Sequence, residues 1–147
     1  MRRPPLAALL AVAAAAGAAG AEEALFGAAE AGPGWSVVDE APEDASADPD
    51  LRRWGVRERR ARHYTREASG AIQVCSIEVW TFGQDAQARA AHAGFAYPEW
   101  RIEREGRVLV MLRGLVMARG RPPQRGVFPA CGSLGERVRS RTRVGSP

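Results

Sequence analysis

The chain has 147 residues, a formal net charge of +4 at pH 7 and a hydrophobic fraction of 46%. This length allows one domain with a modest core and excludes an architecture of several domains. The chain contains two cysteines, two histidines and no lysine, so a metal centre or a nucleophile–base pair has few residues from which it could be built.

The first 21 residues are typical of a secretory signal peptide. A basic start leads into an Ala/Leu run over residues 6–19, and small residues close the segment at Ala21. A membrane-spanning helix needs about 20 consecutive apolar residues, whereas this run is shorter and is broken by Gly17. We therefore predict cleavage after Ala21, export to the periplasm or the medium, and no transmembrane segment in the mature chain. The alternative is an uncleaved anchor.

Charge is unevenly distributed along the rest of the chain. Residues 22–50 carry nine acidic side chains and no basic one, whereas the chain from Leu51 onward carries 19 arginines and eight acids. Because residues 22–50 are also rich in Ala, Gly and Pro, we expect a mobile acidic leader and linker, with a short strand or anchor near Trp35. We expect one domain over residues 51–143 and a frayed tail at 144–147. The acidic leader can associate with this basic domain within one molecule.

The pattern of β-branched, aromatic and turn residues predicts the elements of the domain. They are a strand at 60–66, a strand at 72–82, a helix at 85–93, a hairpin of 100–104 with 107–116, a loop at 120–129 and a helix at 134–141. This order predicts an α+β fold: a small open antiparallel sheet of about four strands, with one helix packed on a face and a short C-terminal helix.

Three residues have expected local roles. Asp85 is placed to cap the helix at 85–93 or to interact with its N-terminal dipole. Gly94 fits the left-handed position that ends a helix, and Gly114 marks a bulge or bend in its strand.

Cys75 and Cys131 are the two cysteines. An even number in an exported chain predicts a disulfide, and the alternative is two unrelated thiols. The bridge would close a loop of about 56 residues, which corresponds to about 4 kcal/mol of stabilisation in the chain-entropy model.

No catalytic, cofactor or metal motif is recognisable. His63 and His92 lie in no known signature, and the histidines and cysteines never pair at the spacing of metal ligands. The clustered carboxylates Glu99, Glu103 and Glu105 have arginines beside them, which favours surface ion pairs over acid/base catalysis. We therefore expect no catalytic residues, no metal and no cofactor. An uncharacterised hydrolase, with residues brought together only by folding, stays an alternative.

The function that we expect is a non-catalytic exported domain that binds a protein or another envelope component through the open face or edge of its sheet. Nucleic acid is not an expected partner, because export removes it from reach. The alternative is an electrostatic binder of lipid headgroups or acidic polysaccharide. Its surface would comprise Arg52, Arg53, Trp54, Arg57, Arg59, Arg60 and Arg62.

Overall fold

The computed structural model describes residues 24–40, 45, 47–95 and 98–144. The predicted signal segment, part of the expected linker and the last three residues of the expected tail lie outside these ranges. Among the described residues, no helix is long and apolar enough to cross a membrane.

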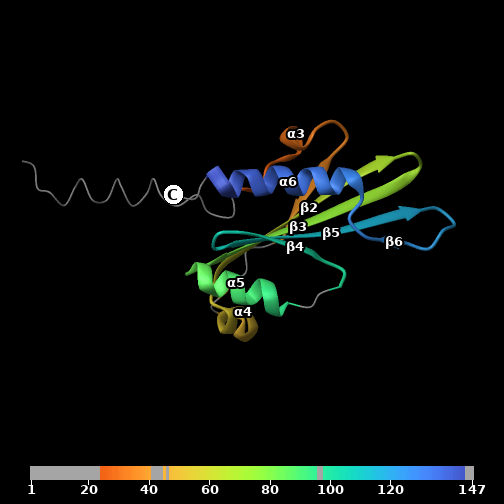
Figure 1. The fold of residues 1–147 in the computed structure, drawn as a ribbon. Helices are drawn as coiled ribbons and strands as arrows, with labels where there is room; N and C mark the ends of the chain where they lie inside the picture. The colour runs from red at the N-terminus through yellow and green to blue at the C-terminus, as the bar shows by residue number, and fades with distance from the viewer. Residues whose placement is uncertain (1–23, 41–44, 46, 96–97, 145–147) are drawn as a thin grey trace, which may run out of the picture.

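The described residues form one six-stranded antiparallel sheet (Figure 1). Its strand order is β1-β2-β3-β5-β4, and β6 pairs with β5. The strands are β1 (Ser36–Asp39), β2 (Val56–Ala68), β3 (Ala71–Phe82), β4 (Arg101–Glu105), β5 (Val108–Ala118) and β6 (Gln124–Arg125). The α+β class and the open antiparallel sheet are confirmed. The number of strands was underestimated, because β1 lies in the expected leader and β6 is only two residues long.

Helices cover both faces of the sheet (Figure 1). On one face, called the α5 face, lie α4 (Pro49–Trp54) and α5 (Asp85–Gly94). The opposite α6 face carries α3 (Ala28–Ala31) and α6 (Pro129–Val144). Strand alternation supplies a core on each side: Ile77 and Val79 face α6, whereas Trp80 and Phe82 belong to the cluster on the α5 face. The central strands are therefore buried on both faces.

The C-terminal helix is longer than the expected segment at 134–141. It begins at Pro129, a residue that suits the first turn because it lacks an N–H donor, and it continues through Gly132 and Gly135. A Cβ atom at Gly135 would lie 2.3 Å from Leu112 Cδ1. The glycine that weakened the helix signal in the sequence is thus required for close packing of α6 on β5.

Residues 24–40 belong to the folded domain, which corrects the expected leader and the boundary at Leu51. Leu25, Phe26 and Trp35 are buried on the α6 face. Tyr64 Oη donates a hydrogen bond of 2.8 Å to the Phe26 carbonyl, and β1 pairs with β2, with Val37 opposite Tyr64. The expected strand near Trp35 is therefore present as β1. The sequence signal was weak because only a few isolated apolar residues attach this segment.

The short helix α4 crosses the expected boundary between linker and domain at Leu51, where we predicted no helix. The Asp48 side chain accepts hydrogen bonds from the backbone N–H groups of Asp50, at 2.9 Å, and Leu51, at 3.4 Å. Leu51 is buried, and Gly55 ends the helix in the left-handed conformation with φ 81°. A helix of six residues with one buried leucine is too short for a helical periodicity to be detected.

Two of the three expected local roles are wrong, and one alternative of the third holds. Gln84 is the N-cap of α5, in a capping box with Gln87, and Asp85 lies in the first turn, where its charge interacts with the N-terminal dipole. Gly94 is the last helical residue without a positive φ, and a Cβ atom there would lie 2.6 Å from Trp54 Cη2. Gly114 lies inside continuous pairing of β3 with β5, and its Cβ atom would lie 2.1 Å from the Gly126 carbonyl oxygen. Both glycines are explained by close approach of a neighbour.

The predicted disulfide is confirmed. Cys75 of β3 is bonded to Cys131 of α6, with Cα atoms 5.3 Å apart, and both residues are fully buried. The bridge fixes the start of α6 to the middle of the sheet.

Candidate functional site

A pocket of about 610 Å³ lies on the α5 face. Aromatic side chains from four places in the chain line it, so we call it the aromatic pocket. Its lining residues are Trp54, Trp80, Phe95 and Trp100, with Leu51, Gly94 and Met111 beside them and Asp48, Asp50, Arg59 and Glu78 as the ionisable groups.

The aromatic residues come together because each stands at the end of an element or on the inward side of a strand. Trp54 is the last residue of α4, Phe95 follows α5 and Trp100 precedes β4, whereas Trp80 points from β3 and is buried. The Phe95 ring lies 5.0 Å from Trp54 and makes an edge contact with Trp80 at 5.2 Å. Such tilted and edge arrangements are the preferred geometries of aromatic pairs.

An ion pair forms one side of the pocket. The Arg59 Nη2 atom lies 2.5 Å from Glu78 Oε1, its Nε donates to Glu78 Oε2 at 3.3 Å, and Trp80 Nε1 donates to the same oxygen at 2.8 Å. Only 14% of the Arg59 side chain and 10% of the Glu78 side chain are exposed. Because both carboxylate oxygens accept charge-assisted hydrogen bonds, the charge of Glu78 is compensated inside the protein. Glu78 is the one ionisable residue of the most apolar strand, and this was the signal in the sequence that could have pointed to the site.

Beside the pocket, a chain of polar side chains runs from Ser76 on β3 through His63 on β2 to Glu40, the residue that follows β1. The His63 ring lies between Ser76 and Glu40, with Nδ1 2.7 Å from Ser76 Oγ and Nε2 2.8 Å from Glu40 Oε1. Arg59 Nη2 connects this chain to the pocket through a contact of 3.4 Å with Glu40 Oε2. The hydrogen bond from His63 is the main cause that holds the pKa of Glu40 below its ordinary value, with Arg59 acting in the same direction against the effect of burial.

A serine, a histidine and a carboxylate in line is the order of groups in an acyl-transfer triad. Ser76, however, is 5% exposed and lies in the middle of β3, paired with His63 on β2 and with Arg113 on β5. Its backbone N–H therefore belongs to the sheet and is not available to an oxyanion. The geometry is that of a satisfied buried hydroxyl. Glu40 stands in the expected linker, so the sequence gave no indication that these three residues meet.

The seven residues of the expected anion-binding surface do not share one face. Arg52 and Arg53 are exposed in the last turn of α4, and Arg57 lies beside Gly83. Strand alternation then separates the next arginines, because Arg59 lies in the pocket while Arg60 and Arg62 point to the other side of β2.

The acidic segment supplies partners for arginines of the domain. Arg62 contacts the Asp39 carboxylate and donates to the Leu25 carbonyl at 2.9 Å, and Arg141 contacts Glu30. Arg60 differs, because it is paired with Glu58 of its own strand at 3.2 Å. The expected association of the acidic segment with the basic domain is confirmed by these contacts.

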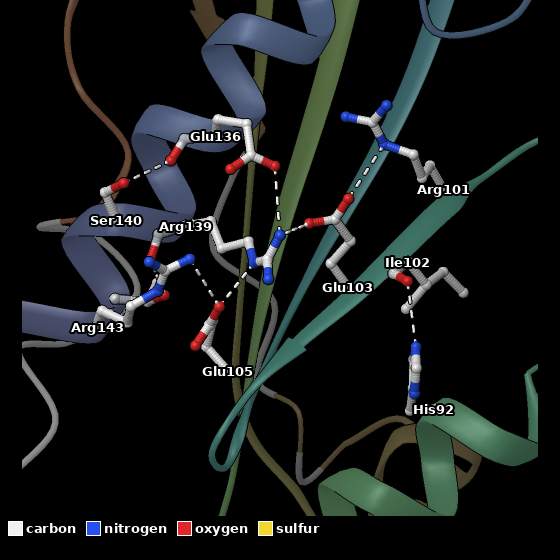
Figure 2. A network of polar contacts seen from close by, with 10 residues as sticks. His92, Arg101, Ile102, Glu103, Glu105, Glu136, Arg139, Ser140 and Arg143 are labelled. Carbon is white, nitrogen blue, oxygen red and sulfur yellow. Dashed lines mark hydrogen bonds and ion pairs between the residues drawn. The ribbon is translucent and has the colours of Figure 1, made fainter.

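The clustered carboxylates near β4 take part in a second network of ion pairs (Figure 2). Arg139 of α6 contacts Glu103 and lies 2.7 Å from Glu105 and 3.3 Å from Glu136, while Arg143 lies 3.1 Å from Glu105. Burial acts to raise the pKa of Glu105, but hydrogen bonds from Arg139 and Arg143 together hold it below the ordinary value. The expected ion pairing of these carboxylates is confirmed, and it attaches the edge strand β4 to α6.

The second histidine makes one polar contact near this network. His92 Nε2 lies 3.2 Å from the Ile102 carbonyl oxygen (Figure 2), which ties the last turn of α5 to β4. Within the residues that the structure describes, no three histidine, cysteine or acidic side chains gather in a way that could hold a metal ion.

No protein-family model, curated protein or solved structure matches the chain. Among the described residues, the aromatic pocket is the candidate site, because it joins a cavity to converging aromatic side chains and a buried ion pair.

Proposed function

We propose that the protein is an exported binding domain without catalytic activity, and that its partner, a protein or another envelope component, places a group in the aromatic pocket. The observation that carries this proposal is the convergence of four aromatic side chains around a cavity of about 610 Å³. Binding sites in proteins are concave and mostly apolar, have a few polar groups, and measure roughly 300–1,000 Å³.

The hydrogen bonding in the pocket supports binding over catalysis. A general acid or base must reach the proton that it transfers. The carboxylate of Glu78 instead accepts hydrogen bonds from Arg59 and Trp80, and that of Asp48 accepts two from the backbone of α4. These groups hold the walls of the pocket in place.

A fragment screen by NMR tests this function. Each of the four tryptophans has one indole N–H group, so we expect four signals in ¹⁵N-labelled protein, with Trp35 on the α6 face as an internal control. We expect fragments that bind to shift the signals of Trp54, Trp80 and Trp100 and to lose affinity in Trp54→Ala. If fragments shift Trp35 to the same extent, or none binds at millimolar concentration, the pocket is not a binding site.

Export is the second part of the proposal. It is supported by the apolar run in the first 21 residues and by the buried Cys75–Cys131 disulfide, since such bonds persist in oxidising compartments. Fractionation of producing cells with N-terminal sequencing should find the protein outside the cytoplasm with Glu22 as its first residue. A cytoplasmic protein that retains Met1 would contradict this proposal.

A hydrolase is the second candidate, and the chain Glu40–His63–Ser76 is the observation that favours it. Because Ser76 is buried in a central strand, we expect no covalent labelling by a fluorophosphonate probe. Labelling of the protein that disappears in Ser76→Ala would support the hydrolase instead.

The alternative function is electrostatic binding to lipid headgroups or acidic polysaccharide. Of its seven expected residues, the exposed Arg52, Arg53 and Arg57 beside Trp54 still suit it. Salt separates it from binding in the pocket, because exposed charges are screened within about 10 Å at 0.1 M ionic strength. Retention on anionic vesicles that weakens strongly with salt and is lost in the variant Arg52→Gln/Arg53→Gln/Arg57→Gln would support it. Retention that does not change with salt would exclude it.

A further inference from the structure

We infer that the aromatic pocket takes a quaternary or multiply methylated ammonium group, the group found in choline-type headgroups. This inference rests on the proposed binding function and names the chemical class of its ligand. Three properties of the pocket lead to it: the aromatic faces, the sign of the charge at the mouth, and the hydrogen bonds that the polar groups already make.

The aromatic faces provide the attraction. A cation is held electrostatically when it lies within about 6 Å of the centre of an aromatic ring, and tryptophan gives the strongest effect. Three tryptophans, Trp54, Trp80 and Trp100, line this one pocket. The protein already uses one of these rings in this way, since the guanidinium of Arg113 lies 4.6 Å from the centre of the Trp100 ring.

The charge of the lining favours a cation. Three carboxylates, those of Asp48, Asp50 and Glu78, face the pocket together with one guanidinium, that of Arg59. Because Arg59 and Glu78 are paired with each other, the excess negative charge comes from Asp48 and Asp50, on α4 and its cap. Among the lining residues this excess favours a cation over an anion, and it acts against the positive charges outside the lining, which are those of Arg113 over the Trp100 ring and of Arg52 and Arg53 on α4.

The hydrogen bonds distinguish a methylated ammonium from an ordinary one. A lysine-type ammonium is strongly hydrated and brings three N–H donors that need acceptors when it leaves water. Both oxygens of the buried Glu78 already accept from Arg59 and Trp80, and Asp48 Oδ1 accepts from the backbone N–H groups of Asp50 and Leu51. The acceptors that remain for an N–H donor are Asp48 Oδ2 and the carboxylate of the exposed Asp50, where water competes for the donor. A quaternary ammonium has no N–H donor, and its methyl groups can pack directly against the rings. The walls therefore suit the methylated cation better.

Titration with choline chloride, followed by the indole N–H signals of the ¹⁵N-labelled full chain, tests this inference. We expect saturable shifts of Trp54, Trp80 and Trp100 and none of Trp35, which is buried on the α6 face with Phe26 and Tyr64. The neutral isostere 3,3-dimethylbutan-1-ol has the same shape without the charge, and we expect it to bind about tenfold more weakly. Equal affinity of the two probes would overturn the assignment to a cation.

Matched variants separate a local effect from a change in net charge. Asp50 and Glu67 are both exposed acids, but only Asp50 lines the pocket. We expect Asp50→Asn to weaken choline binding by about threefold to tenfold and Glu67→Gln to leave it unchanged. Equal effects of the two substitutions would overturn the proposal. Because Asp50 is exposed and its side chain caps nothing, this variant should fold, and its circular dichroism spectrum checks that it does.

The same titrations identify the source of the ammonium group. They also show whether the ligand class alone is wrong or the binding function as well. Choline that displaces the protein from phosphatidylcholine vesicles identifies a lipid headgroup, whereas binding of free choline without vesicle binding identifies a soluble ligand. If choline does not bind while fragments of another class still shift the three pocket indoles, the ligand class is wrong and the binding function stands. If neither binds, both proposals fail.

Discussion

The ion pair between Arg59 and Glu78 should couple the two residues strongly in stability measurements. Removing one partner of a buried pair leaves the other charge uncompensated and costs about 3–5 kcal/mol, whereas replacing both partners is often nearly neutral. The two side chains are 14% and 10% exposed, so we expect the lower end of this range, about 3 kcal/mol, for Arg59→Met.

A double-mutant cycle also needs Glu78→Gln and the double variant, and both should destabilise the protein less than Arg59→Met does. In Glu78→Gln, Arg59 keeps its contact with Glu40 at 3.4 Å and the amide oxygen can still accept from Trp80, so the expected cost is about 2 kcal/mol. The double variant should cost about 2 kcal/mol or less, because no uncompensated buried charge is left. The resulting coupling energy is about 3 kcal/mol.

Urea unfolding followed by far-ultraviolet circular dichroism measures these values without relying on Trp80 as the probe. The exposed pair of Arg125 and Glu99, at 2.7 Å with side chains 68% and 45% exposed, is the matched control. Its cycle of Arg125→Met and Glu99→Gln should give a coupling energy below about 1 kcal/mol. If the costs at Arg59 and Glu78 add to within about 0.5 kcal/mol, the reasoning from burial is refuted.

Three further predictions concern the stability of the fold. Replacing Cys75 and Cys131 by alanine should lower the free energy of unfolding by about 4 kcal/mol, because the bridge closes a loop with a sequence separation of 56; an unchanged urea midpoint would contradict this. Hydrogen bonds lower the pKa values of Glu40 and Glu105 in the folded state, so their stabilisation is present above the ordinary carboxyl pKa of 4.5 and is lost as the pH falls through the lowered values. The urea midpoint should therefore decrease below about pH 4.5, and this decrease should be smaller in Glu40→Gln; an equal decrease in that variant would be evidence against the assignment. Gly114→Ala should cost about 2 kcal/mol or more, since its Cβ atom would lie 2.1 Å from a backbone oxygen, and a variant as stable as the parent would show that the loop moves freely.

The parts of the fold that could be predicted are those with local patterns. The apolar run of β3, the alanine-rich helix α5 and the β4–β5 hairpin around Gly106 all lie within two residues of the expected bounds. Their signals come from residues close in sequence, such as the β-branched run and the turn glycine. The expected bounds were too short for β2 and α6, because arginines alternate along β2 and two glycines interrupt the helical pattern of α6.

The candidate site could not be predicted, because its residues come from separate elements. Trp54 is the last residue of a helix and Phe95 follows one, whereas Trp80 lies in a strand and Trp100 precedes another. No spacing relates them in the sequence. The pocket exists because α4, a helix of six residues that we did not predict, brings Trp54 against Gly94 at the end of α5.

The amino-acid sequence by itself determined the α+β class, the pairing of Cys75 with Cys131 and the position of the main strands, because composition, cysteine number and short-range alternation act locally. Only the tertiary structure decided that residues 24–40 complete the core and that four aromatic side chains meet beside the Arg59–Glu78 pair. These features depend on which segments cover the two faces of the sheet. Packing between elements that are distant in the chain determines this, and local sequence patterns do not encode it.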